Sequence, residues 1–462
     1  MNIPNPVLIW FIFFCHESLW LNEGFATYCE ELVGTPFILP DNGKSERFVS
    51  DVMQPVMEDD ALQSSHQMSV PINDAANTYM IVDSITYDKG ATVVRMMTHF
   101  LREDTFMRGI TRYLNNYTYG NAEQDDLWKV LNEVGHEEGT LGPELDMKEI
   151  MDTWTLQPGY PVVTVTRNYS NEHSQDINLK QQRFLMFGDD LVGESNEYKW
   201  WIPISFTTTK VADFTDTSCS FWFKSDAEMN ATINIDKEDA LIVNIQETGY
   251  YRVNYDGQNW KLIADALFTD HLSLHQINRA QILNDAFSLA RGNQFNYNLA
   301  LIQTLYMKNE KEYVPWSAAL SGFEYLDLML GPDSTVFRKY LVSQLEPIYE
   351  ELEFYQDGDD SFLNVILRTK IVDRLCNLQY SDCVEKAHTE FKTWMEMEDP
   401  DLDNNIDNSI RSTVYCTSLF NGNDAEWNFM FERMLNAEKK SDKNIMLSSL
   451  GCSSDEIQLQ VR

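Results

Sequence analysis

Apolar residues recur with two different periods along this chain, and the change of period divides it into three stretches. Between residues 19 and 155 they recur every three or four positions, which is the spacing of one face of a helix. The first such run begins at Leu19 and reaches Gly34, where a glycine predicts the end of a helix. We therefore expect a mostly helical stretch that ends at a turn in residues 158–161.

From residue 159 to residue 255 the pattern alternates, and short runs rich in β-branched and aromatic residues are separated by polar turns. These runs predict strands at residues 163–166, 201–206, 220–223 and 233–235, with one or two more between residues 242 and 255. Many short strands with frequent turns favour a small all-β sandwich.

From residue 256 onward the pattern is helical again and stays so to the end of the sequence. One apolar stripe consists of Phe337, Leu341, Leu345, Ile348 and Leu352. Successive amphipathic helices without strands predict a layer of stacked helices. The expected fold class is multidomain α+β, with an apolar N-terminus at residues 1–15 and domains at residues 16–158, 159–255 and 256–462.

Length and charge narrow the possible functions. A chain of 462 residues is too long for one core, so two to four domains are expected. Its 72 acidic residues against 35 basic ones give a formal charge of −37. Such a chain repels phosphate backbones, so we expect no nucleic-acid partner, and solubility accounts for the excess of acidic residues.

No apolar run approaches the roughly 20 residues that cross a bilayer. The nearest candidate, at residues 7–15, resembles the core of a signal peptide. No Lys or Arg precedes this run and no small-residue cleavage site follows it, so sequence unrelated to the rest of the chain is the favoured interpretation.

The cysteines and the glycosylation sequons are consistent with a secreted protein, but by themselves they do not indicate one. Four of the seven cysteines group late in the chain, as Cys376-x6-Cys383 and Cys416-x35-Cys452, and their spacing alone does not fix their pairing. Sequons that matter in a secreted protein begin at Asn116, Asn168 and Asn230.

Two segments imitate a zinc-binding motif without completing it. His16-Glu17-Ser18-Leu19-Trp20 begins like H-E-x-x-H but ends in Trp, whereas both histidines are needed on one helix face. His271 and His275 have the right spacing, but Leu272 stands where the catalytic base belongs. We expect His271 and His275 to cap and pack at the start of a helix.

The stretch Leu19-Trp20-Leu21-Asn22-Glu23-Gly24-Phe25-Ala26-Thr27-Tyr28 resembles the segment with the last zinc ligand in zinc aminopeptidases of the aminopeptidase N type, the gluzincin aminopeptidases. In that family a helix supplies H-E-x-x-H, and a Glu completes the metal site after eighteen intervening residues. The resemblance implies that this Glu is Glu23. Counting back from Glu23, the second His falls at Pro4, the base Glu falls at Met1 and the first His falls before the chain. Because one carboxylate cannot hold zinc alone, we expect that this chain does not retain the family's zinc.

The segment from Ile85 to Met96 is similar to the family segment whose Tyr opens a helix and points its hydroxyl at the scissile carbonyl. The matching residue here is Tyr87. A phenol has a pKa near 10 and stays protonated at neutral pH, so it can donate to the oxyanion of a tetrahedral intermediate. The resemblance therefore implies that Tyr87 stabilises the transition state.

The resemblance continues through residues 248–256, 278–287, 313–316 and 411–416, and covers about residues 19–455. It implies the helical remnant of a thermolysin-like catalytic domain, then a β-sandwich and a stacked-helix domain that stops early. It also implies two disulfides, Cys376–Cys383 and Cys416–Cys452, as in extracellular members. These bridges favour use of the three sequons and an extracellular or cell-surface location.

The family removes N-terminal residues from peptides that have a free N-terminus, and its members often form homodimers through the helical domain. Since H-E-x-x-H is missing from this sequence, we expect an incomplete and inactive version of such an enzyme. The alternative is a non-catalytic extracellular module that binds peptides or a receptor.

Overall fold

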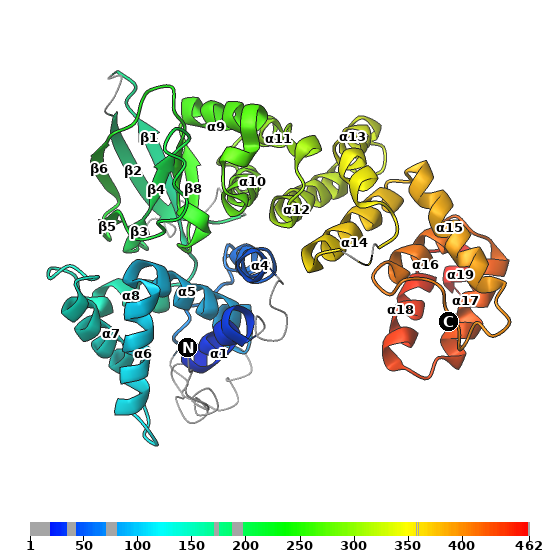
Figure 1. Ribbon diagram of the computed structural model, residues 1–462, viewed down its shortest axis with the longest axis horizontal. Coiled ribbons are helices and arrows are strands. Elements are labelled where there is room, and N and C mark those ends of the chain that lie inside the picture. The colour runs from blue at the N-terminus through cyan, green and yellow to red at the C-terminus, as the bar shows by residue number, and fades with distance from the viewer. Residues whose placement is uncertain are drawn as a thin grey trace. The chain divides into compact units, whose positions relative to one another are not determined.

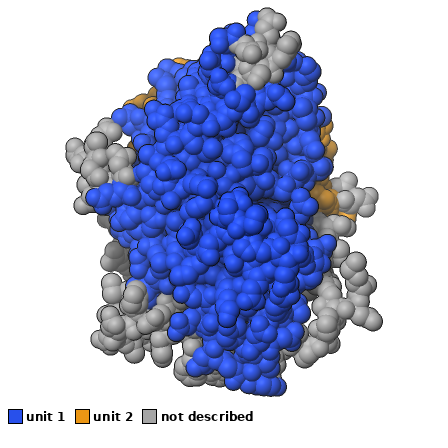
Figure 2. Space-filling view, turned by 90° about the vertical axis from the view of Figure 1, so that its left-hand side faces the viewer, with its two compact units in different colours: residues 1–306, 317–322 blue, residues 307–316, 323–462 orange. Residues whose placement is uncertain are grey.

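The computed structural model describes residues 19–34, 43–70, 81–170, 175–186, 197–356, 358 and 360–460. The chain forms two compact units, which are residues 1–306 with 317–322 and residues 307–316 with 323–462 (Figure 2). The apolar N-terminus expected at residues 1–15 and the His-Glu pair at residues 16–17 lie outside the described residues.

Unit 1 begins with helices arranged around a buried one. Every residue of α5 (Gly90–Leu101) is buried except His99, which is half-buried. This helix therefore has neighbours all round, whereas its sequence predicted one apolar face. It packs against α1 and α6. The helices and helical turns of this part are α1 (Leu19–Tyr28), η2 (Cys29–Gly34), α3 (Lys44–Arg47), η3 (Phe48–Met53), α4 (Gln54–Asp59), η5 (Ile85–Lys89), α5, α6 (Glu103–Asn116), α7 (Gln124–Glu138) and α8 (Met147–Thr155) (Figure 1).

The strands of unit 1 form one four-stranded sheet, ordered β6-β2-β1-β8, and two short ladders, β3-β5 and β4-β7. In the sheet, β1 pairs antiparallel with β2, with Val163 opposite Gln181, and parallel with β8, with Val163 opposite Val253. The strands are β1 (Pro161–Arg167), β2 (Gln175–Arg183), β3 (Ile202–Ile204), β4 (Phe206–Thr208), β5 (Phe221–Phe223), β6 (Glu228–Ile233), β7 (Leu241–Val243) and β8 (Arg252–Tyr255).

The expected mixed fold class is confirmed, but two strands differ from the expectation. Strand β2 was not predicted, because the buried positions after Ile177 and Leu179 are the polar residues Gln181 and Arg183. The buried Gln181 side chain has a hydrogen-bond partner, because its amide donates to the carbonyl of Trp200 at 2.9 Å. The strand expected at residues 233–235 lies earlier, in β6.

The helices after β8 begin with a carboxylate cap, as Asp256 accepts hydrogen bonds from the backbone N–H groups of Gln258 and Asn259. These helices are α9 (Gly257–Asp270), the turn η8 (His271–Ser273), α10 (Gln276–Arg291) and α11 (Tyr297–Gln303). All residues of α10 from Ile277 to Ala290 are buried, including polar ones such as Asp285. This helix is therefore a central element of unit 1.

Unit 2 is helical. Its apolar stripe on α13 is buried at Leu341, Leu345, Ile348 and Leu352, which agrees with the sequence pattern. Its elements are η9 (Met307–Asn309), α12 (Tyr313–Leu330, of which residues 317–322 belong to unit 1), α13 (Thr335–Leu352), α14 (Phe362–Asn377), α15 (Ser381–Met395), α16 (Arg411–Phe420), α17 (Asp424–Asn436), α18 (Lys440–Leu450) and α19 (Glu456–Gln460).

Two disulfides join these helices, in the pairing that the family resemblance implied. Cys376–Cys383 connects the end of α14 to the start of α15, with a Cα–Cα distance of 5.2 Å. Cys416–Cys452 connects α16 to the turn after α18, with a Cα–Cα distance of 5.3 Å. Throughout the described part of the chain, no helix is both long enough and apolar enough to cross a membrane.

Candidate functional site

The site begins with two glycines that let α1 approach the start of α5. A Cβ atom added to Gly24 would lie 2.7 Å from the carbonyl carbon of Gly90, and one added to Gly90 would lie 2.9 Å from the Cα of Gly24. No side chain fits there, so the two helices meet backbone to backbone. This contact brings together Glu23, next to Gly24, and Tyr87, one turn before Gly90.

Glu23 and Tyr87 interact directly although they are 64 positions apart in the sequence. Burial, the negative charge of Glu23 and a hydrogen bond with its side chain, in that order, raise the pKa of Tyr87. The phenol is therefore protonated at neutral pH, and the Glu23 carboxylate is its neighbouring acceptor. Both side chains are half-buried, so they remain accessible from outside the helix pair.

Further carboxylates lie beside this pair. Burial raises the pKa of Asp88, the next residue after Tyr87, to about 6, and the charges of Asp59 and Glu31 add to the effect. Asp59 is in turn held by the hydroxyl of Ser84, which donates to it at 2.7 Å. Asp88, Asp59 and Glu31 thus form a group of interacting carboxylates next to the turn that carries Tyr87.

A buried ion pair fixes the turn that carries Tyr87. The ammonium of Lys89 lies 2.8 Å from Asp60 Oδ2, and neither side chain is exposed. Lys89 also donates to the carbonyl of Gly159 at 2.9 Å, while Asp60 accepts from Gly159 N at 3.0 Å and from the hydroxyl of Tyr250 at 3.1 Å. These bonds connect the helical part of unit 1 with the segments that flank its sheet.

A second connection lies one and a half turns further along α5. Arg95 donates to the carbonyls of Glu247 at 2.7 Å and Gln246 at 3.0 Å. The Glu247 side chain is also buried and accepts from the amide of Gln54 at 3.0 Å. Burial raises the pKa of Glu247 to about 8, with a further rise from the charge of Asp285. The orientation of α5, and with it the position of Tyr87, is set by these buried groups.

Four supporting residues of the site, Asp60, Lys89, Arg95 and Glu247, were not predicted from the sequence. A signal for two of them was present, since Lys89 and Arg95 stand in an otherwise apolar helical segment, where a charged residue needs a partner. Their partners are too distant in the sequence to be named from it.

The structure places the remaining expected residues as follows. The sequon residues Asn116, Asn168 and Asn230 are exposed. His275 caps α10 by accepting from Ile277 N at 3.2 Å, and the ring of His271 packs on a tyrosine, so the expected capping and packing are confirmed.

The described residues do not by themselves fit a zinc ion. Zinc sites in proteins are four-coordinate, and even catalytic ones take three protein ligands. Within the described ranges, no group of three or more His, Cys, Asp or Glu side chains could hold a metal ion. Glu23 can supply one ligand, so a complete site needs donors from outside this group.

Comparison with known proteins gives two family matches. Residues 14–154 match the family described as "Peptidase family M1 domain", and residues 240–460 match the one described as "ERAP1-like C-terminal domain". Both Glu23 and Tyr87 lie within the first match.

Individual relatives match along nearly the whole chain. Aminopeptidase N of Mus musculus is 34% identical over 453 residues, which is 95% of this chain and 45% of the relative. Aminopeptidase N of Homo sapiens is 34% identical over 450 residues, with the same coverage. The thyrotropin-releasing hormone-degrading ectoenzyme of Homo sapiens is 33% identical over 452 residues, which is 95% of this chain and 41% of that protein. The chain therefore spans less than half the length of these relatives.

Proposed function

The chain belongs to the M1 peptidase family, of the aminopeptidase N type, and we propose that it forms the later part of a zinc aminopeptidase site. The reaction proposed is removal of the N-terminal residue from peptides with a free N-terminus. The observation that carries this proposal is the proximity of the Glu23 and Tyr87 side chains at the Gly24–Gly90 contact, where burial and the Glu23 carboxylate raise the pKa of Tyr87. Two residues matched independently to family positions are adjacent in space.

In this proposal Glu23 is the third protein ligand of the family's zinc, which supplies the Lewis acid and activates water when bound. In the same proposal, the Tyr87 hydroxyl is the hydrogen-bond donor to the substrate. With its pKa raised, its hydroxyl keeps its proton and can donate to the carbonyl oxygen of the scissile bond as negative charge develops there. Lys89 and Arg95 are positioning residues, because they hold the helix on which Tyr87 is carried.

The 462 residues contain no H-E-x-x-H sequence, and we propose that they neither bind zinc nor hydrolyse peptides when they are the only protein present. Losing the metal and the base would remove the nucleophile itself, a much larger effect than losing a supporting group.

The domain boundaries that we propose are those predicted from the sequence pattern, after residues 158 and 255.

We propose an extracellular or cell-surface location for the working protein. Two observations support it: the two disulfides, which persist in oxidising compartments, and the exposure of all three sequon asparagines. Glycosylation at Asn116, Asn168 and Asn230 belongs to the same proposal, as does pairing of two copies through the helical unit.

The proposal is tested by mapping the 5′ end of the natural transcript and assaying its product. The expected result is coding sequence that places H-E-x-x-H before Glu23 with eighteen intervening residues, and a product that binds zinc and releases the first residue of an alanyl-anilide substrate. A transcript that begins at Met1, with a secreted product that binds peptides without cleaving them, would overturn it in favour of a non-catalytic binding module.

A further inference from the structure

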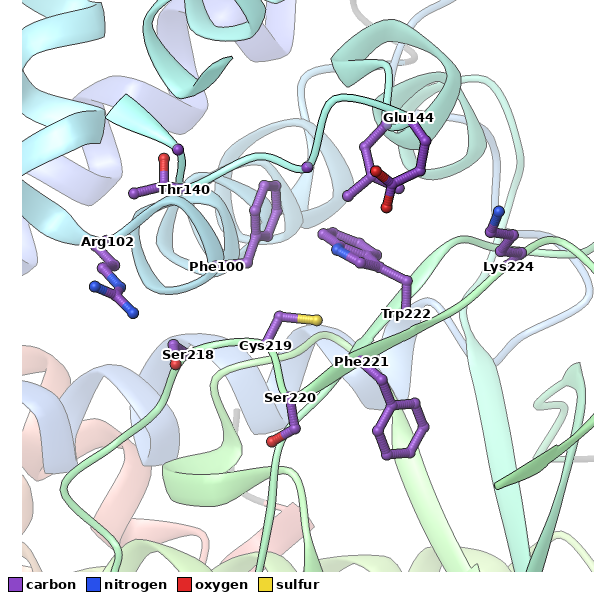
Figure 3. A pocket seen from close by; sticks show the side chains of 13 residues that line it. Phe100, Arg102, Thr140, Glu144, Ser218, Cys219, Ser220, Phe221, Trp222 and Lys224 are labelled. Atoms are coloured by element: carbon purple, nitrogen blue, oxygen red, sulfur yellow. The ribbon is translucent and has the colours of Figure 1, made fainter. Parts of the chain in front are cut away.

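Unit 1 contains a cavity at the end of α5 opposite to Tyr87. Its volume is about 440 Å³, and it lies between the end of α5, the connection from α7 to α8, and the segment that leads into β5 (Figure 3). The twelve residues of α5 separate it from Tyr87 by about 18 Å along the helix. A cavity of this size can hold a small organic molecule.

The residues that line the cavity include more cations than carboxylates, whereas the whole chain has many more carboxylates than cations. Its lining includes Arg102 and Lys224 but only one carboxylate, Glu144, in a chain whose formal charge is −37. Figure 3 shows Arg102 and Lys224 on opposite sides of the cavity, with aromatic rings between them. The lining itself therefore carries two cations and one carboxylate, which favours an anionic ligand.

Arg102 is the cation better suited to bind that anion. The ammonium of Lys224 already lies over the ring of Trp201, 5.3 Å from its centroid. Asp216 lies near Arg102. Hydrogen bonds from Ser218 N at 3.0 Å and Ser218 Oγ at 2.6 Å lower the pKa of Asp216 most, and the charge of Arg102 lowers it further. The exposed guanidinium of Arg102 offers paired N–H donors that match the geometry of a carboxylate.

The wall beside Arg102 is aromatic. The rings of Phe100 and Trp222 meet edge to face with centroids 5.1 Å apart, and Trp222 is only half-buried, so part of its indole borders the cavity. Cys219 also lines the cavity, but burial raises the pKa of its thiol to about 12, so it is neutral and unreactive. The site is therefore suited to reversible binding of a flat apolar group.

We propose that this cavity binds a small aromatic carboxylate, with its carboxylate on Arg102 and its ring against Trp222 and Phe100. The proposal does not depend on peptidase activity, because no lining residue belongs to the Glu23–Tyr87 group. Binding there would act on the C-terminal end of α5, and the turn η5, which carries Tyr87, directly precedes the other end of this helix.

The backbone offers a variant that removes only the guanidinium side chain. Arg102 has φ 67° and ψ 141°, a conformation that favours glycine, and Gly331 takes a similar one after α12 with φ 74° and ψ 179°. Arg102→Gly is therefore expected to fold at least as well as the parent chain. Glu353→Gly makes the same kind of change after α13, where φ is 58°, and is the matched control.

The test is calorimetric titration of the whole chain with indole-3-acetate, its neutral analogue indole-3-acetamide, and acetate. The proposal predicts one-to-one binding of indole-3-acetate that is weakened at least about tenfold in the amide, in acetate and in Arg102→Gly, and is unchanged in Glu353→Gly. Circular dichroism checks that each variant is folded, and Arg102→Gln replaces the glycine variant if that one is not. Absence of binding, equal binding of the amide, or unchanged binding by a folded Arg102 variant would each overturn the proposal.

Discussion

The ammonium of Lys89 lies 2.8 Å from the carboxylate of Asp60, and both side chains are fully buried. Two residues before Lys89, the same helical turn carries Tyr87. The ion pair is therefore the nearest structural support of the candidate site. Burial lowers the pKa of Lys89, but Asp60 and the Gly159 carbonyl favour its charged form.

Breaking this ion pair should destabilise unit 1 strongly. In Lys89→Met, Asp60 stays buried with hydrogen-bond donors but without its counter-charge, and we expect a loss of about 3 kcal/mol in the free energy of unfolding. Urea titration monitored by tryptophan fluorescence measures the loss. The control is Lys210→Met, which removes an ion pair to Asp236 at the surface, where the Lys210 side chain is 66% exposed, and should cost far less. Equal costs for the two variants would contradict the account.

The contact between Gly24 and Gly90 should not accept a methyl group. In Gly24→Ala the new Cβ would lie 2.7 Å from the backbone of Gly90, so the helices must separate, at a cost of about 1–3 kcal/mol. The thermal unfolding midpoint should fall accordingly. Gly257→Ala is the control, because no atom lies within 4 Å of its added Cβ and its site in α9 is helical, so its midpoint should stay the same or rise. A tolerated Gly24→Ala would show that α1 and α5 do not meet in this way.

Glu247 should make stability fall as pH rises. Its pKa is about 8 in the folded chain against an ordinary value of 4.5, so the folded state binds the extra proton between these pH values. Its contribution is fully present below about pH 4.5 and is lost as pH rises through 8, at up to about 1.4 kcal/mol per pH unit. Glu247→Gln keeps the shape but does not titrate. The difference in unfolding free energy, variant minus parent, should therefore increase from pH 5 to pH 8, and a difference independent of pH would contradict the assignment.

The two disulfides should contribute unequally to the stability of unit 2. Chain entropy predicts about 2.5 kcal/mol for a separation of 7 residues and about 3.8 kcal/mol for one of 36. Replacing both Cys416 and Cys452 by serine should therefore lower the unfolding free energy by about 1.3 kcal/mol more than replacing Cys376 and Cys383. Denaturant titration of the two double variants gives the comparison. The reverse order would show that strain or residual structure outweighs loop length.

The helices and most strands could be predicted from the sequence because their apolar periods are local properties. Strand β2 could not, because its inward residues Gln181 and Arg183 are polar and are satisfied by partners elsewhere in the fold. In α10 the same effect made a central helix look amphipathic, since Asp285 is buried against Arg252 at 3.1 Å. A buried polar residue can be recognised as buried only when its partner is known.

The two named residues of the candidate site were predicted from the sequence, but the residues that hold them in place were not. Glu23 and Tyr87 stand in segments with distinctive neighbouring residues, so the family resemblance identified both. Lys89 and Arg95 bind backbone carbonyls of Gly159 and Glu247, which are far away in the sequence. A carbonyl group is present at every position, so no residue pattern marks the one that accepts the bond.

The most direct test of the account is to measure zinc content and turnover in a natural product that has H-E-x-x-H in place of the first residues of this sequence, alongside its Glu23→Ala and Tyr87→Phe variants. The account predicts one zinc per chain in the parent and in Tyr87→Phe, with kcat reduced about a hundredfold or more in the latter. It predicts loss of zinc in Glu23→Ala. Full zinc in Glu23→Ala together with an unchanged kcat in Tyr87→Phe would contradict the roles proposed for both residues.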